Sequence, residues 1–208
     1  MATQTHSPTQ TATAPGVQRS GILVRVVVAF SLVAVVSALV GVVLSGASYE
    51  PAPGGLPDAG PIVGWLLPVV GALTFVCAMA TVGWLLLAGF LDPAAGKTTV
   101  SKRGRTALLR ASAAAGIWCI ISLVAAVFKL ASILGIDLGT AVGPSTFITY
   151  AWDIIDVRTL LICALLAAII SVGAAISVSL NGTTVWFGLA VAAVAIPAMA
   201  GHAAGLGD

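Results

Sequence analysis

The sequence predicts an all-α polytopic membrane protein, and three observations lead to this prediction. Apolar residues make up 59% of the 208 residues and charged residues only 8%, whereas about 25% of a soluble domain is charged. The mean hydropathy is +1.11. The few charged residues lie between long apolar stretches, with Lys and Arg on one set of connections and Asp and Glu on the other. A soluble fold is therefore excluded.

Five apolar stretches have the roughly 20 residues that a helix needs to cross the bilayer core. The first is longer than the 7–15 apolar residues of a cleaved signal peptide, so we interpret it as an uncleaved span. Residues 1–20 are polar and rich in Ser, Thr and Pro, which predicts a disordered cytoplasmic tail. We expect a five-helix transmembrane domain over 21–204 and a short outer tail over 205–208. The predicted spans are 22–44, 62–91, 107–133, 158–179 and 184–201.

The charges predict the orientation, because Lys and Arg concentrate on cytoplasmic connections. The amino terminus is expected inside and the carboxy terminus outside. The net charge of +2 is explained by this orientation and does not indicate a nucleic-acid partner. The stretch 139–155 is too polar to span and predicts a short helix on the outer surface. The basic connections carry Arg19, Arg25, Lys97, Lys102, Arg103, Arg105 and Arg110, and the acidic ones carry Glu50, Asp58, Asp137, Asp153 and Asp156.

Small residues recur at four-residue spacing on three spans. Such rows allow helix backbones to approach closely, which drives packing in lipid. Because Ala is abundant, each row is as readily a chance pattern as an interface. The rows are Ser37 and Gly41, then Ser112 and Gly116, then Ala167, Ser171 and Ala175.

The charged residues at the ends of the predicted spans can be explained by structural roles. Arg110 can reach the cytoplasmic surface, Arg158 begins a span beside Asp156, and Lys129 can be neutralised by Asp153, Asp156 or Asp137. The spans carry no acidic residue at mid-depth, and no base-and-orienter pair is evident. We therefore do not expect an enzyme.

Two sets of soft ligands are candidates for binding a metal. Met199 and His202 are three residues apart, so they share one helix face if the last span continues through AMAGH. Thioether and thiolate groups suit Cu(I), and imidazole suits several metals, although a packing Met and an interfacial His explain this pair more simply. Cys77 and Cys119 lie at similar depth, with Met79 nearby. A lone Cys in an apolar helix more often serves as a small hydrophobe.

Three segments resemble the amino-terminal portion of actinobacterial copper resistance D (CopD) membrane proteins. They are PAPGGLPDAGPIVGWLLPVVGALTFVCAMATVGWLLLAGFLDP, SKRGRTALLRASAAAGIW and IPAMAGHAAG, and the resemblance extends over about residues 20–206. In that family this portion is often followed by further helices and a fused cytochrome c oxidase assembly domain. The resemblance implies copper transport or delivery, with His202 as a copper ligand and Met199 as its helper. The family's later helices, with their histidines, have no counterpart in this sequence.

The leading functional hypothesis is therefore copper handling in the cytoplasmic membrane of a bacterium, with a copper ion as the possible cofactor. Other membrane subunits, or further carboxy-terminal helices, would complete the coordination. The alternative is a non-catalytic structural or accessory subunit of a larger membrane complex such as a respiratory oxidase. An enzyme with its site in 139–155 is a third and weaker hypothesis.

Overall fold

The computed structural model describes the backbone of residues 32–33, 36–37, 40–41, 49, 53–54, 56–91 and 98–203, and the side chains of these residues up to 197. The predicted tails 1–20 and 205–208, most of the predicted span 22–44, and the basic residues Arg19, Arg25 and Lys97 lie outside the described residues.

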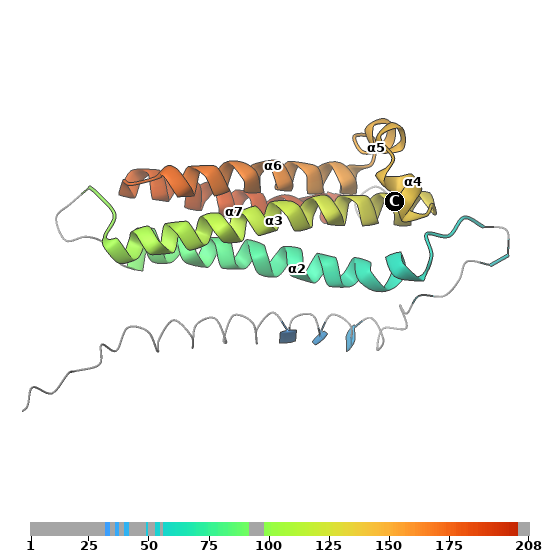
Figure 1. Cartoon of the computed structure of the whole chain (residues 1–208), viewed down its shortest axis with the longest axis horizontal. Coiled ribbons are helices and arrows are strands. Elements are labelled where there is room, and N and C mark those ends of the chain that lie inside the picture. The colour runs from blue at the N-terminus through green and yellow to red at the C-terminus, as the bar shows by residue number, and fades with distance from the viewer. Residues whose placement is uncertain are drawn as a thin grey trace, which may run out of the picture.

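Four long helices lie side by side in Figure 1. They are α2 (Pro61–Leu86, continued by a π-helical turn over Leu87–Leu91), α3 (Lys102–Leu134), α6 (Ile155–Ile176) and α7 (Leu180–Ala203). All four are long and apolar enough to cross a membrane. The described residues form no strand, only an isolated bridge between Thr99 and Ser179. The all-α prediction is confirmed for the described residues, and four helices among them are candidates for crossing a membrane.

Helix α3 begins five residues before the apolar stretch that predicted it. Ser101 adopts an extended conformation and its side chain accepts a hydrogen bond from the Gly104 backbone N–H at 2.9 Å, which caps the helix. The helix ends at Gly135, whose φ of 61° is left-handed and favours glycine. A capped basic turn thus extends α3 beyond the apolar segment.

The segment 138–155 contains two short helices rather than the single one predicted for 139–155. Helix α4 (Leu138–Val142) is capped by the side chain of the preceding Asp137, and α5 (Pro144–Tyr150) follows at once. Pro144 lacks an N–H and restricts the residue before it. Gly143 therefore ends α4, and the chain starts a new helix at the proline.

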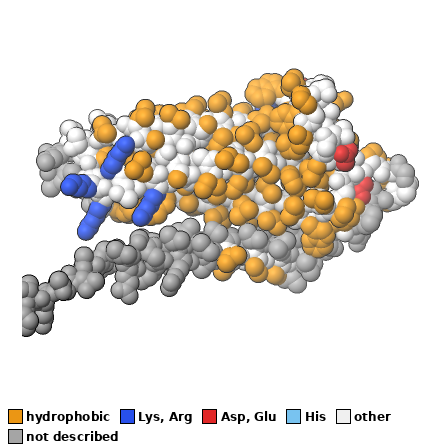
Figure 2. Space-filling view, viewed as in Figure 1, with side chains coloured by type: hydrophobic (Ala, Val, Ile, Leu, Met, Phe, Trp, Pro, Cys, Tyr) orange, Lys and Arg blue, Asp and Glu red, His pale blue; other side chains and the backbone are white. Residues whose placement is uncertain are grey.

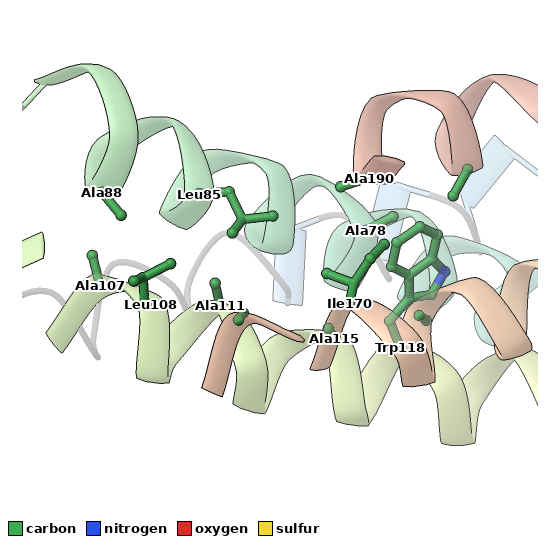
Figure 3. Close-up of a cluster of buried hydrophobic side chains, with 13 residues drawn as sticks. Ala78, Leu85, Ala88, Ala107, Leu108, Ala111, Ala115, Trp118, Ile170 and Ala190 are labelled. Carbon is green, nitrogen blue, oxygen red and sulfur yellow. The ribbon is translucent and has the colours of Figure 1, made fainter. Parts of the chain in front are cut away.

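The main hydrophobic core is built from alanines with a few large side chains between them (Figure 3). Leu85 of α2 lies among Ala107, Leu108 and Ala111 of α3, while Ile170 of α6 packs near Trp118. Alanine faces permit close helix approach, and helices α3 and α6 form the most extensive contact. The pairs α2–α3, α3–α6, α6–α7 and α7–α2 close a ring, in which α2–α7 is the least extensive contact.

Gly173 sets the distance between α6 and α7. A Cβ atom at this position would lie 2.3 Å from the ring of Trp186, far inside van der Waals contact. The indole nitrogen of Trp186 also donates to Ser177 Oγ at 2.6 Å, at the end of α6. The tryptophan therefore packs flat against the glycine while its polar edge binds the turn between the two helices.

Opposite charges gather at opposite ends of the bundle (Figure 2). We call the end with Lys102, Arg103, Arg105 and Arg110 the basic end, and the opposite end, with Asp58, Asp137, Asp153 and Asp156, the acidic end. The neutral turn after α6 belongs to the basic end, because Arg105 donates to the Ser177 carbonyl at 2.7 Å and Leu180 N–H donates to the Thr98 carbonyl at 3.0 Å. The turn therefore lies at the same end of the bundle as the basic connection that precedes α3.

Candidate functional site

The proposed ligands Met199 and His202 both lie on α7, which continues unbroken through Ala203. Because residues three apart lie on one side of an α-helix, Met199 and His202 share one face of α7. Because α7 starts at the basic end, this last turn lies toward the acidic end. The side chains of Met199 and His202 are outside the described residues.

The other predicted ligands differ in their exposure. Cys77 and Cys119 are half-buried and pack against the main core, whereas the Met79 side chain is 48% exposed. Cys77 and Met79 are two positions apart, about 200° around α2, so they face different sides. Within the described part of the chain, no three His, Cys, Asp or Glu residues group closely enough to hold a metal ion.

Cys163 is the most deeply buried of the three free cysteines. Its thiol donates to the backbone carbonyl of Ala193 on α7 at 3.5 Å. This weak bond ties α6 to α7 and satisfies the thiol. Cys163 therefore has a structural explanation that the sequence did not supply.

An ion pair joins α3 to the start of α6 at the acidic end. Lys129 Nζ lies 3.1 Å from Asp156 Oδ2, and the two side chains are 36% and 45% exposed. Of the three carboxylates considered for Lys129, Asp156 is the partner found. Partial exposure keeps the pair solvated enough to limit its energetic worth.

An open-sided cavity of about 500 Å³ extends from this ion pair to the main core. Its volume falls in the range of small-molecule sites, which are mostly apolar with a few polar groups. All four long helices contribute to it. The lining residues are Leu67, Gly71, Thr74, Phe75 and Ala78 of α2, Trp118, Ala125 and Lys129 of α3, Asp156, Thr159, Leu160 and Cys163 of α6, and Ala193, Val194 and Pro197 of α7.

Two buried polar atoms on α3 have no hydrogen-bond partner among the described residues, and only Trp118 of the two residues lines this cavity. They are Nε1 of Trp118 and Oγ of Ser122, in side chains that are 2% and 0% exposed. Buried polar groups are almost always hydrogen-bonded, since leaving one unpaired is costly. Trp118 and Ser122 are one turn apart on α3, so they form one polar strip on its inward face.

The polar contacts near the acidic end have ordinary structural roles. The Tyr49 hydroxyl donates to the Asp58 carboxylate, which raises the pKa of the Tyr49 phenol. The Thr140 hydroxyl and backbone N–H donate to Asp137 at 2.6 and 3.0 Å, and these bonds lower the pKa of the Asp137 carboxyl. Both carboxylates order loop segments.

Arg110 at the basic end contacts an aromatic ring that sequence reasoning missed. Its guanidinium carbon lies 4.8 Å from the centroid of Trp84 on α2, a cation–π contact. The contact therefore joins α3 to α2, and the guanidinium group of Arg110 stays close to the end of the bundle.

The candidate site is interpreted from its own chemistry, because the comparisons with known proteins identify no relative of this chain. No protein-family model, curated protein or solved structure matches this chain.

Proposed function

We propose that this chain handles copper in the cytoplasmic membrane of a bacterium, capturing the ion at the acidic end of the bundle through His202 and Met199. The observation that carries the proposal is the continuity of α7 through Ala203. It places the two residues on one face of one turn. The sequence resemblance to CopD proteins points to the same pair.

The chemistry of the pair favours Cu(I). Thioether and imidazole are ligands that this soft ion accepts readily. A side-chain pair from one helical turn supplies two ligands, and the proposal assigns the remaining coordination to a partner subunit or to further helices. In the proposed orientation the acidic end faces outward, where its carboxylates Asp58, Asp137 and Asp153 favour the approach of a cation.

Onward movement of copper past Met79, Cys77 and Cys119 has less support than capture. Met79 is nearly half exposed on α2, and the two cysteines pack against the core. A relay needs ligands within reach of one another. The proposal therefore places capture at the end of α7 and leaves these three residues as a secondary route.

Copper content tests the capture site directly. Detergent-purified protein is loaded with Cu(I), passed through a desalting column and assayed for bound copper. We expect near-stoichiometric copper in the wild type and in His6→Ala, which removes the other histidine, but a loss in Met199→Ala/His202→Ala. Copper retained by the double variant, or absent from the wild type purified with its partners, would refute the site.

The second candidate is an accessory subunit without its own metal. It is supported by the low burial of α2, in whose most apolar window only 11% of residues are buried against 39% in α6. A helix so little covered by the described residues has an apolar side available to other membrane helices. Purification at fixed stoichiometry with other membrane subunits, without bound copper in the complex, would favour this candidate over copper handling.

A further inference from the structure

The cations at the basic end have no carboxylate partner in the described part of the chain. Every carboxylate that the structure describes belongs to the acidic end, as the separated colours of Figure 2 show. Lys102, Arg103 and Arg110 are all exposed. Over 92–110 the sequence carries five cations against one carboxylate, Asp92, which lies outside the described residues. This end of the bundle therefore has a positive charge that an anion from outside the chain can neutralise.

The side chain of Arg110 is held in place by the ring of Trp84. Its guanidinium carbon lies 4.8 Å from the ring centroid, and Trp84 itself packs against the main core. Among the described arginines of the basic end, Arg105 donates a side-chain hydrogen bond, to the Ser177 carbonyl, and Arg110 donates none. A guanidinium stacked on a ring keeps the N–H groups along its edge available. Arg110 therefore presents an ordered set of donors without an acceptor.

The face of α3 that carries Arg110 changes from cationic to apolar along the helix. Residues seven apart nearly share one side of an α-helix, so Arg103, Arg110, Ile117 and Val124 form one row. All four are exposed, Ile117 by 52% and Val124 by 41%. The predicted apolar span begins at residue 107, only three residues before Arg110. Arg110 thus lies at the boundary between the basic end and the apolar surface of the bundle.

This row matches an anion that has a hydrocarbon chain attached. Phosphate oxygens accept hydrogen bonds from a guanidinium in a bidentate geometry. Ile117 lies about 10 Å from Arg110 along the helix axis, within the roughly 15 Å that one leaflet contributes to the hydrocarbon core. A free phosphate ion could contact Arg110 but would leave the apolar part of the row unused. A phospholipid uses both parts.

We propose that the basic end binds an anionic phospholipid, whose phosphate oxygens accept hydrogen bonds from the Arg110 guanidinium. Arg103 lies above the headgroup, and an acyl chain packs along Ile117 and Val124. Lys102 is about 100° around α3 from Arg103, so it adds diffuse charge without contacting the phosphate. The site lies at the opposite end of the bundle from the proposed copper ligands and is independent of them.

Lipid binding to the full chain in a non-ionic detergent tests the site. Native mass spectrometry during a titration with phosphatidylglycerol gives the number of bound lipids and their dissociation constants. Arg110→Gln removes the charge, and Arg110→Lys keeps the charge but loses the planar fork. Two matched controls each remove one cation. They are Lys102→Gln, at the same end but off the row, and Arg158→Gln, at the acidic end.

We expect one phosphatidylglycerol molecule to bind more tightly than the rest in the wild type and in Arg158→Gln. Loss of charge-assisted hydrogen bonds predicts about 10- to 100-fold weaker binding in Arg110→Gln, and Arg110→Lys should fall between this variant and the wild type. Loss of diffuse attraction in Lys102→Gln should cost at most about 5-fold. Phosphatidylcholine should bind the wild type more weakly, because its choline group neutralises the lipid.

Four results would overturn the proposal. Equal losses of affinity in Lys102→Gln and Arg110→Gln would show diffuse attraction in place of a site. Equal affinity for phosphatidylglycerol and phosphatidylcholine would show that the anionic headgroup is not selected. Displacement of the lipid by soluble glycerol phosphate at a similar concentration would make the ligand a free phosphate. If Arg110→Gln does not fold, Arg110→Lys decides, since unchanged affinity in this conservative variant would exclude bidentate binding.

Discussion

The hydroxyl of Ser171 on α6 donates a hydrogen bond to the backbone carbonyl of Ser112 on α3 at 2.8 Å. The two serine hydroxyl oxygens are also 3.5 Å apart, and a Cβ at Gly116 would lie 3.4 Å from Ser171 Oγ. Two small-residue rows therefore meet across the most extensive helix contact. Their close approach lets a side chain reach the backbone of its neighbour, which larger residues would prevent.

Replacing Ser171 by Ala should destabilise the bundle by about 0.5–1.5 kcal/mol, the worth of an interhelical hydrogen bond in a membrane. Gly116→Leu should cost more, because its side chain must displace Ser171. Unfolding in mixed micelles with increasing denaturing detergent measures both effects. Thr184→Ala is the control, since among the described residues the Thr184 hydroxyl bonds only to the Leu180 carbonyl of its own helix. Equal stability of Ser171→Ala and the control would contradict this prediction.

These rows show how far the sequence could predict helix packing. Spacing alone placed Ser112 and Gly116 on one face and Ala167, Ser171 and Ala175 on another, but it could not identify which faces meet. Ser37 and Gly41 had the same spacing, yet a Cβ at Gly41 would have no atom within 4 Å. Local periodicity specifies a face, whereas its partner depends on contacts between residues far apart in the chain.

Gly173→Ala should be strongly destabilising. Its methyl group would lie within 2.3 Å of the Trp186 ring, so α7 or the indole must move. Overpacking of this kind costs about 1–3 kcal/mol. Gly188→Ala on α7 is the matched control, because a Cβ there meets nothing within 4 Å. Thermal unfolding of the two variants in detergent tests the prediction, and a lower melting temperature for Gly188→Ala than for Gly173→Ala would refute it.

The Lys129–Asp156 pair should contribute a modest coupling energy. Both side chains are more than a third exposed, so solvent screening limits the expected value to about 0.5–1 kcal/mol. A double-mutant cycle with Lys129→Met and Asp156→Asn, measured from the unfolding free energy, gives this quantity. The coupling should shrink at high salt. A coupling of zero at low salt would show that the pair does not hold α3 to α6.

The cavity beside this pair could not be predicted from the sequence. Its walls come from four helices, and small residues such as Gly71, Ala78, Ala125 and Ala193 form part of them. In the sequence these residues are indistinguishable from the many alanines that pack closely elsewhere. The one available signal was Trp118, a large polar-edged residue in the middle of an apolar span. Its significance depends on the missing hydrogen-bond partner, which only the three-dimensional arrangement reveals.

The cap of α4 should weaken in acid. Hydrogen bonds from Thr140 lower the pKa of the Asp137 carboxyl below its ordinary value of 3.8. A carboxyl with a lowered folded-state pKa stabilises the fold above its unfolded pKa, and this contribution is lost as the pH falls through the folded value. Hydrogen–deuterium exchange over 136–143, corrected for intrinsic rates, should thus be slow at pH 7 and faster at a pH well below 3.8. Asp137→Ala should exchange fast at both pH values, and a pH-independent wild type would contradict the assignment.

The segregated charges predict that the basic end faces the cytoplasm, because cationic connections are retained on that side. Thr98 is exposed at the basic end, and Ser145 is exposed on α5 at the acidic end. Each can be changed to Cys in a chain whose Cys77, Cys119 and Cys163 are replaced by Ala. A membrane-impermeant maleimide should label the Ser145→Cys variant in intact cells, and the Thr98→Cys variant only after permeabilisation. The reverse pattern would place Met199 and His202 toward the cytoplasm, so copper arriving from outside could not reach them first.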